Sequence, residues 1–177
     1  MEKHLKLPLT FDELLNLEIG DEVYLTGKIY TARDAAHMEL IKEIKENTLD
    51  LDLRDATIYY AGPTPKKPKE IIGSIGPTSS YRMDKYSKAL LEKGVKIMIG
   101  KGPRNREITG LLKEYKAVYL TAIGGTGALI SKSIKEAKCI RYPHLLAEAI
   151  YELEVKDFYA IVAIDSKGND IFSRKNE

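Results

Sequence analysis

Three short segments of the chain carry side chains that suit the binding of a small anion. The first contains Arg33, whose planar guanidinium can hold a carboxylate through two hydrogen bonds. In the second, residues 73–84, glycines and hydroxyls precede Arg82 and offer free backbone N–H groups to an anion. The third, residues 100–102, places Lys101 between two glycines that let a ligand approach the backbone. Two arginines and a lysine on neighbouring turns predict a binding site for a small dicarboxylate.

Other residues beside these candidates have structural explanations as well as functional ones. Asp34 is expected at the N-cap of a helix, and we favour that role for it. His37 follows in the first turn of the same helix, where a polar residue is common. Thr78 stands four residues before Arg82, so both can face one ligand if their helix begins early; otherwise Arg82 pairs with a surface carboxylate. The chain has no pair of catalytic carboxylates, no metal-ligand cluster and no nucleophile–base pair, so it predicts half of an active site.

Length and composition indicate a soluble globular protein. We expect residues 1–177 to form a single domain, with 44% hydrophobic and 31% charged residues. A net charge of +2 gives no reason to expect nucleic acid as a partner. No apolar run approaches the roughly 20 residues needed to cross a membrane, and the start of the chain does not read as a signal peptide. The single Cys139 excludes an internal disulfide and predicts a reduced, cytoplasmic setting.

The order of predicted elements indicates an α/β fold, in which ligands bind where strands pass into helices. An arm over residues 5–20 contains a short helix capped by Thr10, and the later part of the chain alternates strands with helices. The predicted strands cover residues 22–30, 56–60, 71–75, 95–99 and 117–122, and a closing hairpin covers residues 158–172. The predicted helices cover residues 11–15, 80–93, 104–115, 126–135 and 143–153, and a further helix opens at residues 33–34.

Five motifs in a fixed order carry a specific family resemblance. They are Arg33-Asp34-x-x-His37, Tyr59-Tyr60-Ala61-Gly62-Pro63, Gly76-Pro77-Thr78-Ser79-x-x-Arg82-Met83-Asp84, Ile99-Gly100-Lys101-Gly102 and Gly124-Gly125-x-x-Ala128-Leu129. With these motifs the chain resembles, over nearly its whole length, the beta subunit or C-terminal domain of class I fumarases and L-tartrate dehydratases. Two departures are visible: Ser79 replaces a frequent second threonine, and a Gly-Gly-Thr-Gly run replaces alanines. Neither departure alters the charged residues.

The resemblance implies both a fold and a partner. The fold is a swivelling β/β/α domain, similar to the mobile domain of aconitases. The partner is an alpha subunit whose three cysteines hold a [4Fe–4S] cluster with one open iron, so this chain itself binds no metal. The implied assembly is a heterotetramer, or a homo-oligomer when the chain is alone.

The resemblance also implies roles for individual residues. Arg33, Arg82 and Lys101 are expected to bind the substrate carboxylates. Thr78 is expected to contact the substrate near the proton to be removed, with an aspartate of the partner assisting it as the base. Asp34, His37, Gly76 and Gly100 are expected to support this site.

The implied activity is a hydro-lyase reaction, the reversible hydration of fumarate to (S)-malate in the tricarboxylic acid cycle, catalysed only with the alpha subunit. One alternative is the dehydration of L-tartrate or a related 2-hydroxy diacid, since all these substrates share the two carboxylates. A second alternative, from another class, is a stand-alone module that binds a carboxylate or phosphate metabolite.

Overall fold

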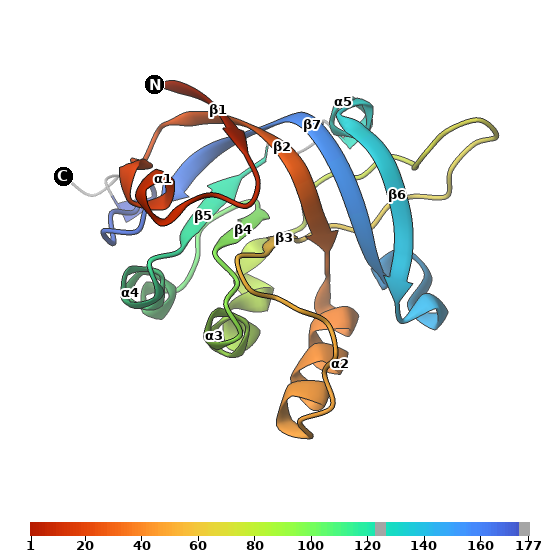
Figure 1. Cartoon of the computed structure of the whole chain (residues 1–177), viewed down its shortest axis with the longest axis horizontal. Coiled ribbons are helices and arrows are strands. Elements are labelled where there is room, and N and C mark those ends of the chain that lie inside the picture. Colours follow the sequence, from red (N-terminus) through yellow and green to blue (C-terminus); the bar gives the residue numbers. More distant parts are fainter. Residues whose placement is uncertain (123–126, 174–177) are drawn as a thin grey trace.

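The computed structural model describes residues 1–122 and 127–173, in which helices and strands are mixed along the chain (Figure 1). The elements, in chain order, are β1 (Glu2–Lys6), α1 (Phe11–Asn16), β2 (Glu22–Thr31), α2 (Asp34–Lys45), β3 (Thr57–Tyr59), the 3₁₀ helix η1 (Ser80–Met83), α3 (Asp84–Glu92), β4 (Ile97–Gly100), α4 (Arg106–Tyr115), β5 (Val118–Thr121), α5 (Gly127–Lys132), β6 (Ile134–Arg141), the 3₁₀ helix η2 (Pro143–Glu148) and β7 (Ile150–Ile164). None of the helices among these residues has the length and apolar character needed to cross a bilayer.

The strands form one sheet that curls back on itself. Their order is β1-β2-β3-β4-β5-β7-β6, and β2 also pairs with β7, which closes the sheet in the manner of a barrel. Strands β1 to β5 pair in parallel, whereas β7 runs antiparallel to β2, β5 and β6. The long strand β7 makes the closure possible because different parts of it pair with β2 and with β5.

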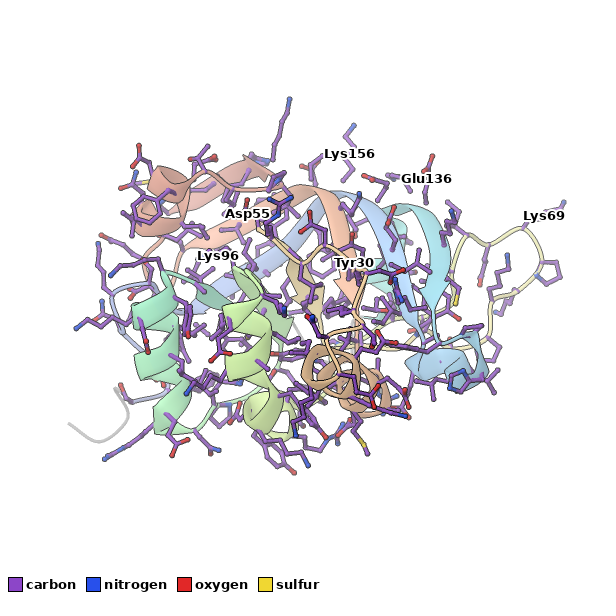
Figure 2. The ribbon with its side chains drawn as sticks, turned by 60° about the horizontal axis from the view of Figure 1, so that its bottom comes forward. Tyr30, Asp55, Lys69, Lys96, Glu136 and Lys156 are labelled. Carbon is purple, nitrogen blue, oxygen red and sulfur yellow. The ribbon has the colours of Figure 1, made fainter. Side chains whose placement is uncertain are left out.

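Alternation along the central strands separates two hydrophobic cores. Ile97 and Ile99 of β4 belong to the core inside the curled sheet, while Met98 between them belongs to the core under the helices. In β5, Tyr119 likewise packs toward the helices. Helices α2, α3 and α4 form a layer on that side of the sheet (Figure 1), and Figure 2 shows α3 and α4 side by side. The α/β class expected from the sequence is therefore confirmed, with a closed rather than an open sheet.

Most of the predicted elements are confirmed, with ends shifted by a few residues. Helix α1 begins as predicted: Thr10 accepts a hydrogen bond from the Glu13 N–H, and the Glu13 carboxylate accepts one from the Thr10 N–H. Helices α2, α3 and α4 and strands β2 to β5 also lie where the sequence placed them. The predicted turn at Gly124-Gly125 and the predicted helix start at Thr126 lie outside the described residues.

Two of the predicted elements are wrong, and β1 and β6 were not predicted. Residues 71–75 form a loop instead of a strand, because the Ser74 N–H donates to the Thr64 hydroxyl and the Thr64 N–H to the Ser74 carbonyl. Residues 143–153 do not form one helix, since Leu146 has a left-handed φ of 54° and β7 follows. The predicted closing hairpin is confirmed with a short second strand: Ile164 and Asp170 form an antiparallel bridge, and the Ile171 N–H donates to the Ala163 carbonyl oxygen at 2.9 Å.

Candidate functional site

The parallel strands place three of the four predicted ligand-binding residues at one edge of the sheet. Strands β2, β3, β4 and β5 are neighbours and run in the same direction, so their carboxyl ends meet at that edge. Arg33 follows β2 and Lys101 follows β4, and Tyr60 follows β3 between them. Thr78 reaches the same edge by hydrogen bonds to Tyr60.

Arg33 occupies the N-cap position of α2, where its side chain makes no capping hydrogen bond. Its Nε atom is buried and has no hydrogen-bond partner among the described residues. Gly62 makes room for this side chain, because a Cβ at residue 62 would lie 3.0 Å from Arg33 Cδ and 2.3 Å from the Ala147 carbonyl oxygen. A partly buried arginine whose Nε–H has no partner among the described residues is well suited to an incoming carboxylate.

The His37 ring forms a hydrogen bond with the backbone of Arg33. The ring is fully buried beside Tyr60 and Tyr86, with centroid distances of 5.5 Å to both. Burial lowers the pKa of His37 to about 4, so the imidazole is neutral near pH 7. Its Nδ1 lies 2.8 Å from the Arg33 carbonyl oxygen and must therefore carry the proton that it donates there. The supporting role expected of His37 stays a prediction.

The expectation that Asp34 caps α2 is wrong. Asp34 is the first residue inside the helix, and its carboxylate pairs instead with Arg82. Arg82 Nη2 donates to Asp34 Oδ1 at 3.2 Å, and Arg82 Nε lies 3.2 Å from Asp34 Oδ2. The Ala35 N–H at the start of α2 donates to the Glu148 carboxylate at 3.2 Å, a contact supplied by a distant segment. The Asp34–Arg82 pair brings the first and second predicted segments together.

Thr78 is fixed to the end of β3 by two hydrogen bonds. Its N–H and its hydroxyl both donate to the Tyr60 carbonyl oxygen, at 2.8 and 2.9 Å. The hydroxyl does not cap η1, whose N-cap is Ser79. Because its hydrogen points to a carbonyl, the lone pairs of the Thr78 oxygen are left to accept from a ligand. The side chain is only partly buried, so a ligand at the edge can reach it.

Lys101 is exposed and lies beside the Thr78 segment. Ser79 and Lys101 form a parallel bridge, and the Ser80 N–H donates to the Lys101 carbonyl oxygen at 3.0 Å. This approach requires Gly100, because a Cβ there would lie 1.9 Å from Ser80 Oγ and 2.9 Å from a ring carbon of Tyr60. The nearest neighbour of a Cβ at Gly76 is 3.7 Å away, so no close approach explains that glycine.

Sequence reasoning missed one group beneath this edge, the buried ion pair between Asp84 and Arg104. Their side chains are only 5% and 0% exposed. The motif containing Asp84 was noticed, but nothing in the local sequence distinguished Arg104 from a solvated residue before a helix. A buried arginine becomes apparent only when Tyr60 and Tyr119 are seen on either side of it.

The residues that the structure describes do not fit an iron–sulfur cluster. Across residues 1–122 and 127–173, no three or more His, Cys, Asp or Glu side chains are grouped so that they could hold a metal ion. Cys139 is exposed on β6. A cavity of about 620 Å³ lies beside the loop of residues 64–74, and its lining contains none of Arg33, Thr78, Arg82 and Lys101. What the edge offers is a set of partly or fully exposed cations beside the Thr78 hydroxyl, with the Asp34 carboxylate paired to one of them.

The chain is similar to known proteins over almost its whole length. Residues 2–175 match the family model of the fumarase C-terminus. The chain is 40% identical over 176 residues to a Methanocaldococcus jannaschii protein provisionally named L(+)-tartrate dehydratase subunit beta, covering 96% of this chain and 90% of that protein. It is 39% identical over 166 residues to the aerobic class I fumarate hydratase of Escherichia coli K12 and 38% identical over 166 residues to fumarate hydratase 2 of Leishmania major.

Each of the latter matches covers 92% of this chain, which spans 30% of the length of the E. coli enzyme and 29% of the L. major enzyme. The match to the family model extends over almost the whole chain, including β2, β3, β4 and every candidate residue. The chain therefore belongs to the fumarase C-terminus family.

Proposed function

We propose that this chain is the beta subunit of a hydro-lyase that interconverts fumarate and (S)-malate, and that it supplies the clamp for the substrate carboxylates. The observation that carries the proposal is the meeting of Arg33, Arg82, Lys101 and Thr78 at one edge of the sheet. A four-carbon diacid has two carboxylates, which matches two arginines and a lysine better than a single-anion ligand would.

The three cationic side chains would stabilise negative charge on the substrate, and the Thr78 hydroxyl would contact the substrate beside the proton that is removed. Dehydration of malate removes a proton from C3 and hydroxide from C2, and loss of the proton places extra negative charge on the adjacent carboxylate. Fixed cations at Arg33, Arg82 and Lys101 stabilise that charge where it develops. The Thr78 oxygen, oriented by the Tyr60 carbonyl, would contact the substrate next to the C3 proton, with a base from the partner subunit completing the transfer.

The proposal needs an alpha subunit, because an open clamp without a base or a Lewis acid is half of a site. The [4Fe–4S] cluster belongs to that partner in our proposal, in keeping with the poor fit of the residues described for this chain. We place the assembly, a heterotetramer, in the reducing cytoplasm, where a lone exposed cysteine is stable. The resemblance extends the proposal to a swivelling domain whose closure on the partner excludes water.

Dehydration of L-tartrate is the second candidate function. It is favoured by the match to the M. jannaschii protein, since this chain spans 90% of a protein named as a separate beta subunit. Tartrate presents the same pair of carboxylates to the clamp, so the substrate choice depends on the groups that face its hydroxyls. A stand-alone binding module is the remaining alternative.

One experiment separates these candidates. The chain is co-expressed with a candidate alpha subunit, purified without oxygen, and assayed with fumarate, malate and the tartrates. We expect hydration of fumarate by the complex and none by the chain alone. Activity on tartrate only would replace the first candidate by the second. Hydration of fumarate by the metal-free chain alone, or no activity of an intact cluster-bearing complex on any of these diacids, would contradict the proposal.

A further inference from the structure

Arg104 has a fully buried side chain and packs against Tyr60 and Tyr119, behind the residues that we propose to bind substrate. Arg104 pairs through Nε with the Asp84 carboxylate, and its Nη2 donates to Ser87 Oγ at 2.9 Å and to the Tyr60 hydroxyl at 3.3 Å. Removing two charges from water costs several kcal/mol, which the ion pair recovers only with good geometry and further hydrogen bonds. An ion pair buried at that cost calls for an explanation other than packing.

The guanidinium is held between two aromatic rings. Its central carbon lies 4.8 Å from the ring centroid of Tyr119 and 5.3 Å from that of Tyr60. Burial by itself would lower the pKa of Arg104, but the Tyr60 hydroxyl and the Asp84 carboxylate hold that pKa above its ordinary value. Arg104 therefore stays charged and its planar fork has fixed contacts.

The contacts of Arg104 extend through Tyr60 to the segment that contains Thr78. Tyr60, which accepts a hydrogen bond from Arg104 through its hydroxyl, accepts both hydrogen bonds of Thr78 through its carbonyl. Asp84 follows Arg82 by two residues, and its Oδ2 accepts the Asn105 N–H at 2.9 Å. The start of α3 and the residue before α4 are thus joined at Arg104.

The same group reaches the Lys101 loop through Tyr119. The Tyr119 hydroxyl oxygen lies 2.8 Å from both the Gly102 carbonyl oxygen and Ser80 Oγ. A carbonyl can only accept, so Tyr119 donates to Gly102 and accepts from Ser80. Ser80 in turn donates its N–H to the Lys101 carbonyl. The ring on which Arg104 packs therefore fixes both sides of the gap between Lys101 and the Thr78 segment.

We propose that Arg104 is a positioning residue, which sets the spacing of Thr78, Arg82 and Lys101 through Tyr60, Asp84 and Tyr119 and does not contact substrate. A purely stabilising role would predict that an uncharged replacement of the whole pair restores full activity along with stability. A positioning role predicts that such a replacement keeps the stability of the chain but weakens its affinity for substrate. The kinetic part of this inference rests on the proposed function.

The test uses a double variant, Arg104→Met with Asp84→Asn, which removes both charges but keeps an acceptor for the Asn105 N–H. Arg106→Met, an exposed arginine at the start of α4, is the matched control. We expect the unfolding midpoint of the double variant to stay within about 5 °C of wild type. In the complex, KM for the diacid should rise about tenfold and kcat should fall about tenfold, because misplaced groups lose about 100-fold in kcat/KM. Arg106→Met should leave both constants within about twofold of wild type.

A structural role would give a different pattern, in which the active fraction falls and lowers kcat while KM stays at the wild-type value. That pattern, or a fully active double variant, would overturn the inference. Amide hydrogen exchange provides a readout that does not depend on the reaction. Peptides covering residues 76–83 and 100–104 of the full chain should exchange about tenfold faster in the double variant, while peptides of α1 stay unchanged. Unchanged exchange in both segments would overturn the inference even if the complex proved inactive on every diacid tested.

Discussion

The Asp34 carboxylate lies 3.2 Å from the Arg82 guanidinium and joins the start of α2 to η1, 48 residues further along the chain. Their side chains are 37% and 39% exposed, so the pair contributes less than about 1 kcal/mol to stability. Its importance lies in the charge at the site. The Asp34 carboxylate lies beside a surface that we propose to bind anions, and the positive charge of Arg82 neutralises this carboxylate.

Removal of Arg82 should therefore harm the reaction in two ways. Arg82→Ala should lower kcat/KM by on the order of 10³-fold, because a cation is lost and the Asp34 carboxylate is uncovered. Adding Asp34→Asn to it should recover about tenfold, since the uncovered charge is removed. Steady-state kinetics and thermal unfolding of the complex measure both effects. A steep fall of the unfolding midpoint, with normal kinetics of the folded fraction, would make Arg82 a structural residue.

Thr78 should affect turnover more than affinity. In Thr78→Ala the clamp cations remain, so KM should change little while kcat falls about 10²-fold or more, a typical effect of losing a group in proton transfer. Thr78→Ser keeps the hydroxyl and its bond to the Tyr60 carbonyl, and should retain substantial activity. Near-normal turnover of the alanine variant in an intact complex would remove Thr78 from the mechanism.

His37 should make stability depend on pH between about 6.5 and 4. Because burial lowers its pKa from 6.5 to about 4, the unfolded chain binds a proton in this range that the folded chain does not. The free energy of unfolding should thus be highest above pH 6.5 and fall by about 3 kcal/mol as the pH decreases to 4. Urea titrations at several pH values measure this slope. His37→Gln should flatten it, and an unaltered slope in that variant would assign the pH dependence to other groups.

Gly100 should be sensitive to one added methyl group. A Cβ at Gly100 would collide with Ser80 and Tyr60, so Gly100→Ala should cost about 1–3 kcal/mol and raise KM by separating Lys101 from the Thr78 segment. Gly110 in α4 is the control, because no atom lies within 4 Å of its Cβ position. Gly110→Ala should stabilise the chain by up to about 1 kcal/mol. Equal stability of the two variants in denaturant unfolding would show that the contact at Gly100 relaxes without cost.

Local sequence patterns were enough to predict the elements that carry the clamp. Thr10, as a plausible cap, indicated the start of α1, and strand-forming residues and helical periodicity located β2 to β5 and α2 to α4. Such signals are short-range, and they placed Arg33 and Lys101 after the strands that present them. The likeness of the motifs to a known family added the expected roles.

What the sequence did not predict depends on contacts between distant segments. Residues 150–153 looked helical, but β2 and β6 both offer them a pairing edge, and this pairing outweighed the local preference. Asp34 has the character of a cap, yet its partner is Arg82. Arg104 stands before a helix as a solvated residue would, and only the packing of three separate elements around it explains its burial.

The central claim, that this edge of the sheet binds both carboxylates of a diacid, is tested most directly by the inhibition constant of succinate against the complex. Arg33→Gln and Lys101→Gln each remove one cation from the clamp. Lys67→Gln is the control and removes an exposed lysine from the loop that also contains Lys69. Figure 2 shows Lys69 far to one side of the molecule.

Each clamp variant should raise the inhibition constant by about 10- to 100-fold, because a hydrogen bond to a charged group contributes about 1.5–3 kcal/mol. Lys67→Gln should leave the constant within about twofold of wild type. Inhibition constants that are equal in all three variants and the wild-type complex would contradict the account.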